Sequence, residues 1–185
     1  MVRVLVGDIF KSTMQTLTNT VNCVGVMGKG IALEFKKRFP DMYGDYEDRC
    51  KRNEVKLGRP YLFNRLFPPS ILLFPTKEHW RSVSSLSAIE EGLEHLKSNY
   101  KQWGITSIAV PPLGCGLGEL EWNIVGPTLY KHLRDLEIPV ELYAPWNTPH
   151  MQLTPEFLDE VSPAQAAESK RAATRIEPGF ISIVE

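Results

Sequence analysis

The sequence is poor in the residues that cross-link a chain or hold a metal ion. It has only three cysteines, an odd number with no CxxC pair, and its four histidines are scattered without an HExxH motif or a Cys/His cluster. An odd, unclustered set of cysteines is typical of a reducing compartment and argues against a disulfide framework. We therefore expect a cytoplasmic protein that uses no metal and no other cofactor.

Long apolar runs and an excess of one charge are also absent. No apolar run approaches the roughly 20 residues that span a bilayer, and the opening segment MVRVLVGDIF lacks the pattern of a signal peptide. We therefore expect no membrane partner. The formal net charge of the 185 residues is −1, which excludes a general binder of polyanions. Nucleic acid would have to bind through a local basic face.

Apolar periodicity divides the chain into short strands and amphipathic helices. Strands are expected over 2–6, 15–22, 61–67, 71–77, 105–110 and 139–145. Helices are expected over 31–39, 41–53, 84–104 and 125–136, with a short one over 154–160. This alternation predicts an α/β fold with helices layered on a mixed, mostly parallel sheet. In such folds, ligands bind at the carboxyl ends of the strands.

Glycines are concentrated in two loops, CVGVMGKGIA at 23–32 and LGCGLGEL at 113–120. Each loop follows an expected strand and precedes an expected helix. Bare backbone lets N–H groups approach a ligand closely, and a helix start adds partial positive charge, so each loop suits a phosphate. The first loop is too short for GxxxxGKS/T, and the second reads GxGxG instead of GxGxxG. Tight turns are the alternative, but two such loops, with Asp8 after the first strand, favour a diphosphate ligand.

Three segments carry a resemblance to a known family. VGDIF at 6–10, NTVNCVGVMGKGIALEFKKRFP at 19–40 and PPLGCGLGELEW at 111–122 resemble the macrodomain, a fold that binds ADP-ribose. The resemblance covers about residues 1–146 and implies a three-layer α/β/α fold with a mixed, mostly parallel central sheet. We place the macrodomain at 1–155 and expect a polar tail or linker, helical in part, at 156–185.

Two segments point to one macrodomain subgroup. MGKGIALEFKKRFPDMY at 27–43 and TKEHWR at 76–81 are similar to the subgroup of the DarG antitoxins and the terminal ADP-ribose glycohydrolase of animal cells, and the first matches DarG best. The resemblance implies a hydrolase that removes ADP-ribose from thymidine bases in single-stranded DNA and so reverses the modification made by the toxin DarT. Release of ADP-ribose from glutamate esters on proteins, or binding of ADP-ribose without turnover, are the alternatives.

The partners that this resemblance implies are ADP-ribose, ADP-ribosylated single-stranded DNA and a DarT-type toxin. DarG proteins usually continue past the macrodomain into a region that binds the toxin. We therefore expect a toxin to bind through a region absent from this chain.

The resemblance assigns the ADP-ribose site to both glycine loops and to the ends of several strands. The residues that it implies as ligand contacts are Asp8, Ile9, Thr20, Asn22, Lys29, Gly30, Ile31, Ala32, Thr76, Gly114, Cys115, Gly116, Leu117, Gly118, Pro145 and Trp146. Asp8 would accept a hydrogen bond from the adenine amino group, and Asn22 would bind the distal ribose. The glycine loops would enclose the diphosphate, and Pro145 would pack near the adenine.

Lys77 and Asn22 are the predicted catalytic residues. Lys77 follows the apolar segment ILLFPT and so should lie at the end of a strand. The alternative to a catalytic role is that Lys77 is a solvated surface charge. The resemblance implies catalysis, because TK of TKEHWR falls where the glycohydrolase relatives place their lysine. As an ammonium it would stabilise the departing base; as a neutral amine it would attack the anomeric carbon and form a Schiff base. Those relatives also carry an acid in the second loop, where this chain has Gly118 followed by Glu119.

Overall fold

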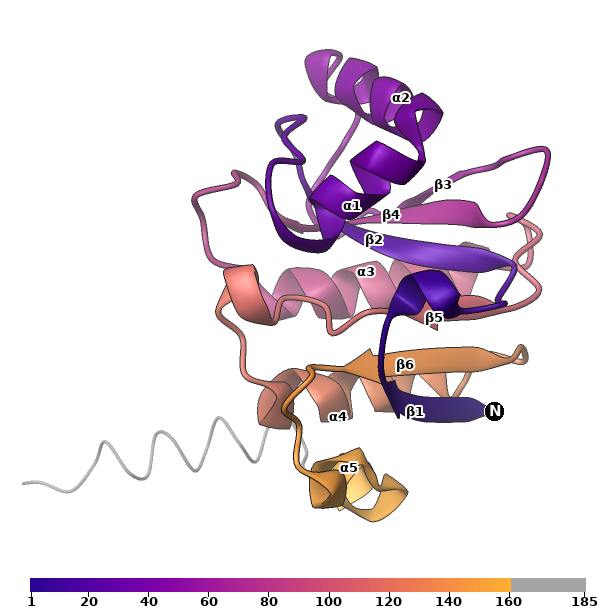
Figure 1. Ribbon diagram of the computed structural model, residues 1–185, viewed down its shortest axis with the longest axis vertical. Helices are drawn as coiled ribbons and strands as arrows, with labels where there is room; N and C mark the ends of the chain where they lie inside the picture. The colour runs from indigo at the N-terminus through magenta and orange to yellow at the C-terminus, as the bar shows by residue number, and fades with distance from the viewer. Residues whose placement is uncertain (161–185) are drawn as a thin grey trace, which may run out of the picture.

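The computed structural model of the protein describes residues 1–160, and six strands form one sheet in the order β1-β6-β5-β2-β4-β3 (Figure 1). The strands are β1 (Val2–Val6), β2 (Thr16–Asn22), β3 (Tyr61–Phe63), β4 (Ser70–Lys77), β5 (Ile108–Val110) and β6 (Val140–Ala144). All neighbouring pairs are parallel except β3 and β4, which are antiparallel. The predicted mixed, mostly parallel sheet is therefore confirmed, and the carboxyl ends of its five parallel strands meet at one edge.

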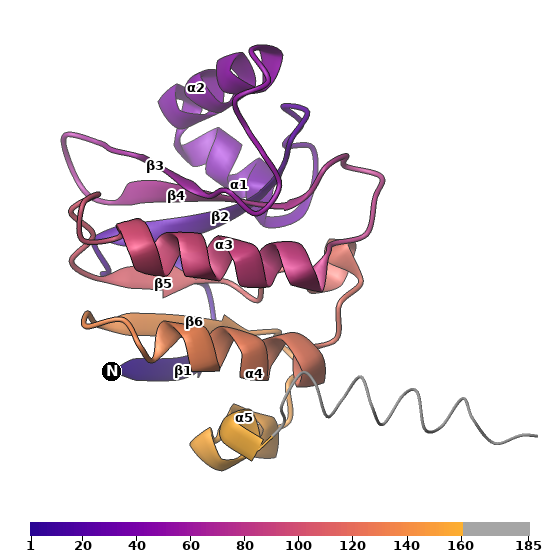
Figure 2. The same cartoon turned by 180° about the vertical axis from the view of Figure 1, so that it is seen from behind.

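Helices cover both faces of this sheet. One face carries α1 (Gly30–Arg38) and α2 (Pro40–Lys51), and the other carries α3 (Leu86–Asn99) and α4 (Trp122–Leu133), as Figures 1 and 2 show from opposite sides. Each face has its own apolar core: one is built around α3 and α4, and the other around α1 and α2. This arrangement confirms the predicted three-layer α/β/α fold. None of the helices within residues 1–160 is long and apolar enough to cross a membrane.

Short helices complete the described chain. Three 3-10 helices are η1 (Ile9–Lys11), η2 (Gly116–Gly118) and η3 (His150–Leu153), and the last helix is α5 (Pro155–Glu160). The α5 helix packs on α4, and its Leu158 is fully buried in the core of that face. Packed structure thus continues past residue 155, where we placed the end of the domain. Most of the expected tail, residues 161–185, lies outside the described residues.

The strands predicted over 61–67 and 71–77 are neighbours in the sheet and run antiparallel, but the first is shorter than predicted. It ends at Phe63 instead of residue 67, because the side chain of Ser70 takes over the pairing. The Ser70 hydroxyl donates to Asn64 Oδ1 at 3.0 Å and accepts from the amide of Arg65 at 3.3 Å. Side-chain hydrogen bonds of this kind compete with a backbone ladder.

Candidate active site

A cavity of about 1110 Å³ lies at the edge where the parallel strands end. Its lining includes the loop after β1, the ends of β2 and β4, both glycine loops and the segment after β6. All of the predicted contact residues contribute to this lining, and so does Lys77. The structure therefore brings together every residue of the predicted site, whereas the role of each residue toward ADP-ribose stays a prediction.

Asp8 lies at the end of the cavity predicted to hold adenine, directly after β1. Its Oδ1 accepts a hydrogen bond from the amide of Phe10 at 3.0 Å and so caps η1. One carboxylate oxygen is thereby used for structure, and the second remains available for a ligand amine. Pro145 and Trp146 follow β6 in the same lining, and the Trp146 side chain is 72% exposed.

Asn22 ends β2 and holds the first glycine loop together. Its Oδ1 accepts from the amides of Val24 at 3.0 Å and Val26 at 3.3 Å, and its Nδ2 donates to the carbonyl oxygen of Val26 at 2.7 Å. The hydroxyl of Tyr46, reaching over from α2, lies 3.0 Å from the same Oδ1. An amide nitrogen carries two N–H groups, so one donor remains for a ribose hydroxyl. Asn22 thus both shapes the loop and faces the cavity.

The start of α1 offers the backbone that the first loop was predicted to provide. Gly30 has a φ of +58°, a left-handed conformation that favours glycine. The preceding Lys29 makes no side-chain cap, so the first N–H groups of α1 have no partner from that residue. Such a helix start binds anions readily, which suits the predicted diphosphate.

Steric contacts explain the glycines of the second loop. A Cβ at Gly114, where φ is +78°, would meet Leu120 Cδ1 at 2.6 Å. A Cβ at Gly118 would lie 2.4 Å from the Oγ of Ser84, whose side chain is buried in the segment between β4 and α3. Ser84 therefore fills the space in which a side chain at position 118 would begin. No pattern in the sequence predicts this contact, because it joins residues far apart in the chain.

Lys77 lies at the end of β4, paired with Asn22. A register shift between Val21 and Asn22 aligns Asn22 with Lys77 across the two strands. The Nζ of Lys77 donates a 3.0 Å hydrogen bond to the carbonyl oxygen of Leu117, in the second glycine loop. The two predicted catalytic residues thus lie side by side, and the lysine also touches the second wall of the cavity.

Glu119, Arg81 and Cys115 are further residues of the second glycine loop and of the segment TKEHWR whose positions the structure defines. Glu119, which follows Gly118 in the second loop, is the C-cap of η2 with a φ of +64° and does not belong to the cavity lining. The Arg81 guanidinium lies over the ring of Trp80 at 4.5 Å, and both residues line the cavity. Burial raises the pKa of the Cys115 thiol to about 12, which keeps it neutral and fits a packing role.

The described residues contain no group of three or more His, Cys, Asp or Glu side chains that could hold a metal ion.

Known proteins resemble this chain in both sequence and fold. A DNA ADP-ribosyl transferase-DNA ADP-ribosyl glycohydrolase fusion protein from Thermosipho africanus is 48% identical over 172 residues, which cover 82% of this chain and 44% of that relative. The structure of Thermosipho africanus DarTG in complex with ADP-ribose matches with a TM-score of 0.80 and 49% identity, over 85% of this chain and 45% of that one. This chain therefore spans less than half of the length of these relatives.

A third match has a length similar to the described domain. The macrodomain of Mycobacterium tuberculosis DarG matches with a TM-score of 0.75 and 44% identity, over 78% of this chain and 98% of that one. The Macro domain family pattern itself matches residues 18–129, from β2 through the two glycine loops into α4. The chain therefore belongs to the Macro domain family.

Proposed function

We propose that this chain is a hydrolase that removes ADP-ribose from thymidine bases of single-stranded DNA and thereby acts as an antitoxin. The observation that carries the proposal is the pairing of Lys77 with Asn22 in the lining of a cavity that both glycine loops enclose. A module that only binds ADP-ribose needs the glycine loops but has no use for a lysine at this place. The names of the DNA ADP-ribosyl glycohydrolases that the chain resembles support the choice of DNA as substrate.

The proposed reaction breaks the N-glycosidic bond between the anomeric carbon of the distal ribose and the thymine nitrogen. Water gives its hydroxyl group to the anomeric carbon, and its remaining proton goes to the departing base. The transition state is oxocarbenium-like, as in other glycoside cleavage. The remaining N–H of Asn22 Nδ2 would orient a ribose hydroxyl, and Lys77 Nζ would stabilise the departing base. The adenine and diphosphate contacts would supply binding energy remote from the bond that breaks.

A DarT-type toxin is a further proposed partner, through a region outside this chain. The Thermosipho africanus relative is named as a fusion of a DNA ADP-ribosyl transferase with a glycohydrolase, which supports a functional link between the two activities. We propose the cytoplasm as the place of action, in line with the cysteine pattern.

The test compares two substrates under the same conditions. A single-stranded oligonucleotide carrying ADP-ribosyl-thymidine and a protein carrying ADP-ribose on glutamate are incubated with the chain, and free ADP-ribose is quantified. We expect release from the DNA. Release from the protein alone would replace the proposed substrate, and release from neither, with ADP-ribose still bound in calorimetry, would indicate a binding module.

A further inference from the structure

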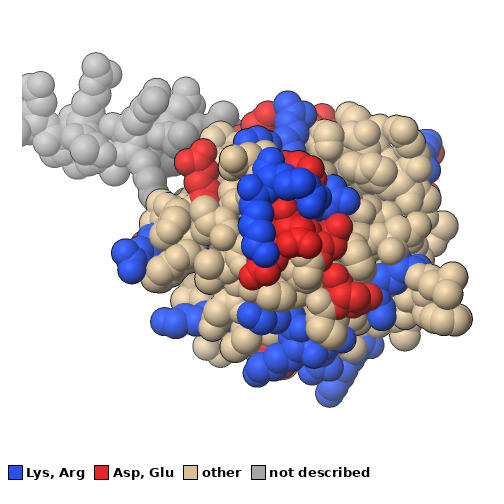
Figure 3. Space-filling view, turned by 90° about the horizontal axis from the view of Figure 1, so that it is seen from above, with Lys and Arg blue, Asp and Glu red and all other residues tan. Residues whose placement is uncertain are grey.

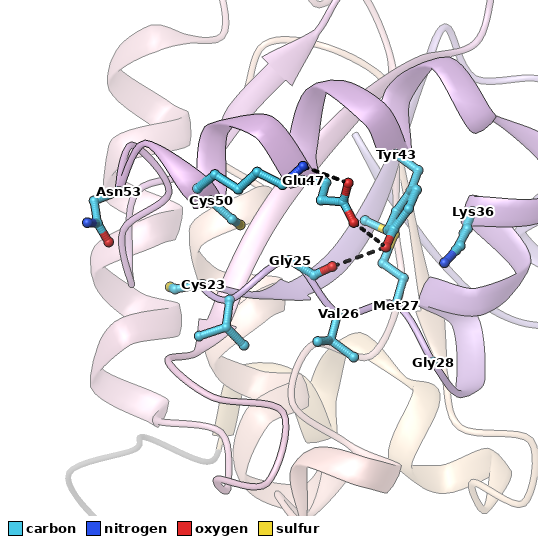
Figure 4. A pocket seen from close by; sticks show the side chains of 12 residues that line it. Cys23, Gly25, Val26, Met27, Gly28, Lys36, Tyr43, Glu47, Cys50 and Asn53 are labelled. Carbon is cyan, nitrogen blue, oxygen red and sulfur yellow. Dashed lines mark hydrogen bonds and ion pairs between the residues drawn. The ribbon is translucent and has the colours of Figure 1, made fainter.

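A second cavity, of about 530 Å³, lies on the other side of the first glycine loop, between that loop and helices α1 and α2 (Figure 4). Its lining consists of the loop at 23–28 together with side chains of α1, α2 and the turn after α2. Val26 and Gly28 also line the ADP-ribose cavity, so a single stretch of backbone separates the two. Its size lies within the range of ligand pockets, roughly 300–1,000 Å³.

The second cavity lies close to the residue predicted to hold the sugar at which the bond would break. Asn22, the predicted contact of the distal ribose, anchors the separating loop through Val24 and Val26. The distal ribose is the sugar that carries the DNA base in the proposed substrate. A route out of the ADP-ribose cavity for a DNA strand attached there runs beside the residues that anchor this loop.

The walls combine apolar surface with an aromatic ring. The apolar residues Val24 and Val26 are 46% and 38% exposed. The Tyr43 hydroxyl lies 3.3 Å from the carbonyl oxygen of Gly25, which fixes the ring against the loop (Figure 4). Apolar and aromatic surface of this kind accepts nucleotide bases of any sequence.

The charged groups of the second cavity favour an anion. Lys51 pairs with Glu47 at 3.0 Å, and Glu47 also accepts from the Tyr43 hydroxyl, so this carboxylate is neutralised. Lys36 makes no ion pair with any residue from 1 to 160; its Nζ lies over the Tyr43 ring at 3.9 Å. Burial raises the pKa of the Cys23 thiol to about 11, so the thiol adds no negative charge. One uncompensated lysine therefore faces the cavity.

The surrounding surface does not supply a broad basic field. Figure 3 looks onto the α2 side of the molecule, and basic and acidic side chains lie next to each other there. Ion pairs along α2 account for much of this mixture, including Arg49 with Asp45 and Lys51 with Asp48. Any polyanion bound here would thus be held locally, by the cavity itself, with a small number of phosphate contacts.

We propose that this second cavity binds the single-stranded DNA next to the modified base, with a neighbouring base on Val24 and Tyr43 and a phosphate at Lys36. The inference rests on the proposed function and names the part of the substrate beyond ADP-ribose that the chain recognises. It predicts that the enzyme prefers an oligonucleotide to an isolated ADP-ribosylated nucleoside.

The test uses Lys36→Ala and Val24→Glu, with Lys37→Ala as the matched control. Lys37 belongs to the same helix, is paired with Glu34 and does not line the cavity. Release of ADP-ribose is measured from three substrates: an ADP-ribosylated oligonucleotide, ADP-ribosyl-thymidine nucleoside and an ADP-ribosylated protein. We expect kcat/KM to fall about tenfold on the oligonucleotide in both cavity variants, equivalent to about 1.4 kcal/mol, and to stay unchanged on the nucleoside. Lys36→Ala should also make the affinity for the oligonucleotide less dependent on salt, with the slope of log K against log salt concentration reduced by about one.

Each other outcome is decisive. Equal losses on both substrates, no loss on either, or the same loss in Lys37→Ala would overturn the DNA assignment. A loss confined to an ADP-ribosylated protein substrate would assign the cavity to a protein partner instead. If the unaltered chain releases ADP-ribose from neither DNA substrate, the proposed function fails. Binding of a fluorescent single-stranded oligonucleotide then decides on the cavity, since weaker binding by Lys36→Ala supports the assignment and equal binding refutes it.

Discussion

The Nζ of Lys77 donates a 3.0 Å hydrogen bond to the carbonyl oxygen of Leu117. This contact ties the end of β4 to the second glycine loop, and the register of β2 and β4 places Asn22 beside the same lysine. The lysine is therefore held between the two walls that would enclose the ligand. A lysine that served only as a solvated surface charge would need neither contact.

Replacing Lys77 with methionine should slow turnover strongly and leave ADP-ribose binding close to unchanged. The substitution keeps most of the aliphatic stem and removes the amine, whose two proposed roles both concern the bond that breaks and not the adenosine or the diphosphate. Loss of one donor of this kind costs about 10²–10³-fold in kcat. Single-turnover release of ADP-ribose measures the rate, and calorimetry measures the affinity. Unchanged turnover would remove Lys77 from the mechanism.

Borohydride separates the two roles of Lys77. If the neutral amine attacks the anomeric carbon, a Schiff base forms during turnover, and reduction should leave ADP-ribose attached to Lys77, detectable by mass spectrometry of peptides. If the ammonium stabilises the departing base, no adduct should form while turnover continues. The Lys77→Met variant is the control for attachment at other lysines.

Asp8→Asn should weaken ADP-ribose binding while keeping the fold. The amide oxygen of asparagine can still cap η1 at Phe10, as Asp8 Oδ1 does at 3.0 Å. Its NH₂ group would then face the adenine amino group, so that two donors oppose each other. Losing a hydrogen bond to a carboxylate should weaken affinity by about tenfold to a hundredfold. Calorimetry with ADP-ribose checks this, and an unchanged affinity with an unchanged melting temperature would reject the adenine assignment.

The close packing of Ser84 against Gly118, which leaves no space for a side chain at position 118, can be tested by a double-mutant cycle. Gly118→Ala places a Cβ 2.4 Å from Ser84 Oγ, at a residue without a positive φ, so the clash alone should cost about 1–3 kcal/mol of unfolding free energy. Ser84→Gly removes both atoms that clash and should recover most of that loss in the double variant. Urea unfolding of the four proteins measures the coupling.

Gly116 offers the control for this cycle. Its φ is +66°, and a Cβ there would meet nothing within 4 Å. Gly116→Ala should therefore lose roughly 1 kcal/mol through backbone strain alone, and Ser84→Gly should not restore it. If Ser84→Gly rescued both alanine variants to the same extent, it would act by loosening the loop in general and not by removing the clash.

Local signals account for the part of the fold and site that the sequence predicts. Apolar runs mark the strands, and the glycine loops follow them, so the meeting of the loops at one sheet edge follows from parallel topology. The buried face of α2 also had a signal, because Met42, Tyr46 and Cys50 recur at a spacing of four residues. That spacing indicates that Tyr46 points inward, but not that its hydroxyl meets Asn22.

The contacts that the sequence does not predict join distant segments. Ser84 stands at the start of the helix predicted over 84–104, and the next residue, Ser85, is the one that caps α3. The approach of Ser84 to Gly118 depends on how the segment after β4 packs against the second loop. The alignment of Asn22 with Lys77 depends on a register shift within the sheet. Neither feature leaves a pattern in the residues on either side of it.

The buried carboxylate of Glu141 on β6 should make stability depend on pH. Burial raises its pKa, but hydrogen bonds from Ser12 at 2.6 Å, Tyr143 at 3.0 Å and Arg3 outweigh burial, so the pKa of the carboxyl is lowered in the folded protein. The unfolded chain therefore binds a proton at higher pH than the folded chain does. The stabilisation is complete above the unfolded pKa of about 4.3 and is lost as the pH falls through the folded value.

Glu141→Gln should consequently destabilise the protein at neutral pH and not in acid. The amide keeps the shape but loses the charge that Arg3 and the two hydroxyls stabilise, for a difference of roughly 1 kcal/mol in unfolding free energy at pH 7. That difference should shrink as the pH falls below about 4.3, because the carboxyl of the parent protein then becomes neutral as well. Urea unfolding from pH 7 to pH 3 measures it, with Glu137→Gln as the control, since the side chain of Glu137 pairs with Lys101 at an exposed site, where ion pairs contribute little to stability. A difference that stays constant across this range would mean that Glu141 stabilises β6 by packing and not by its charge.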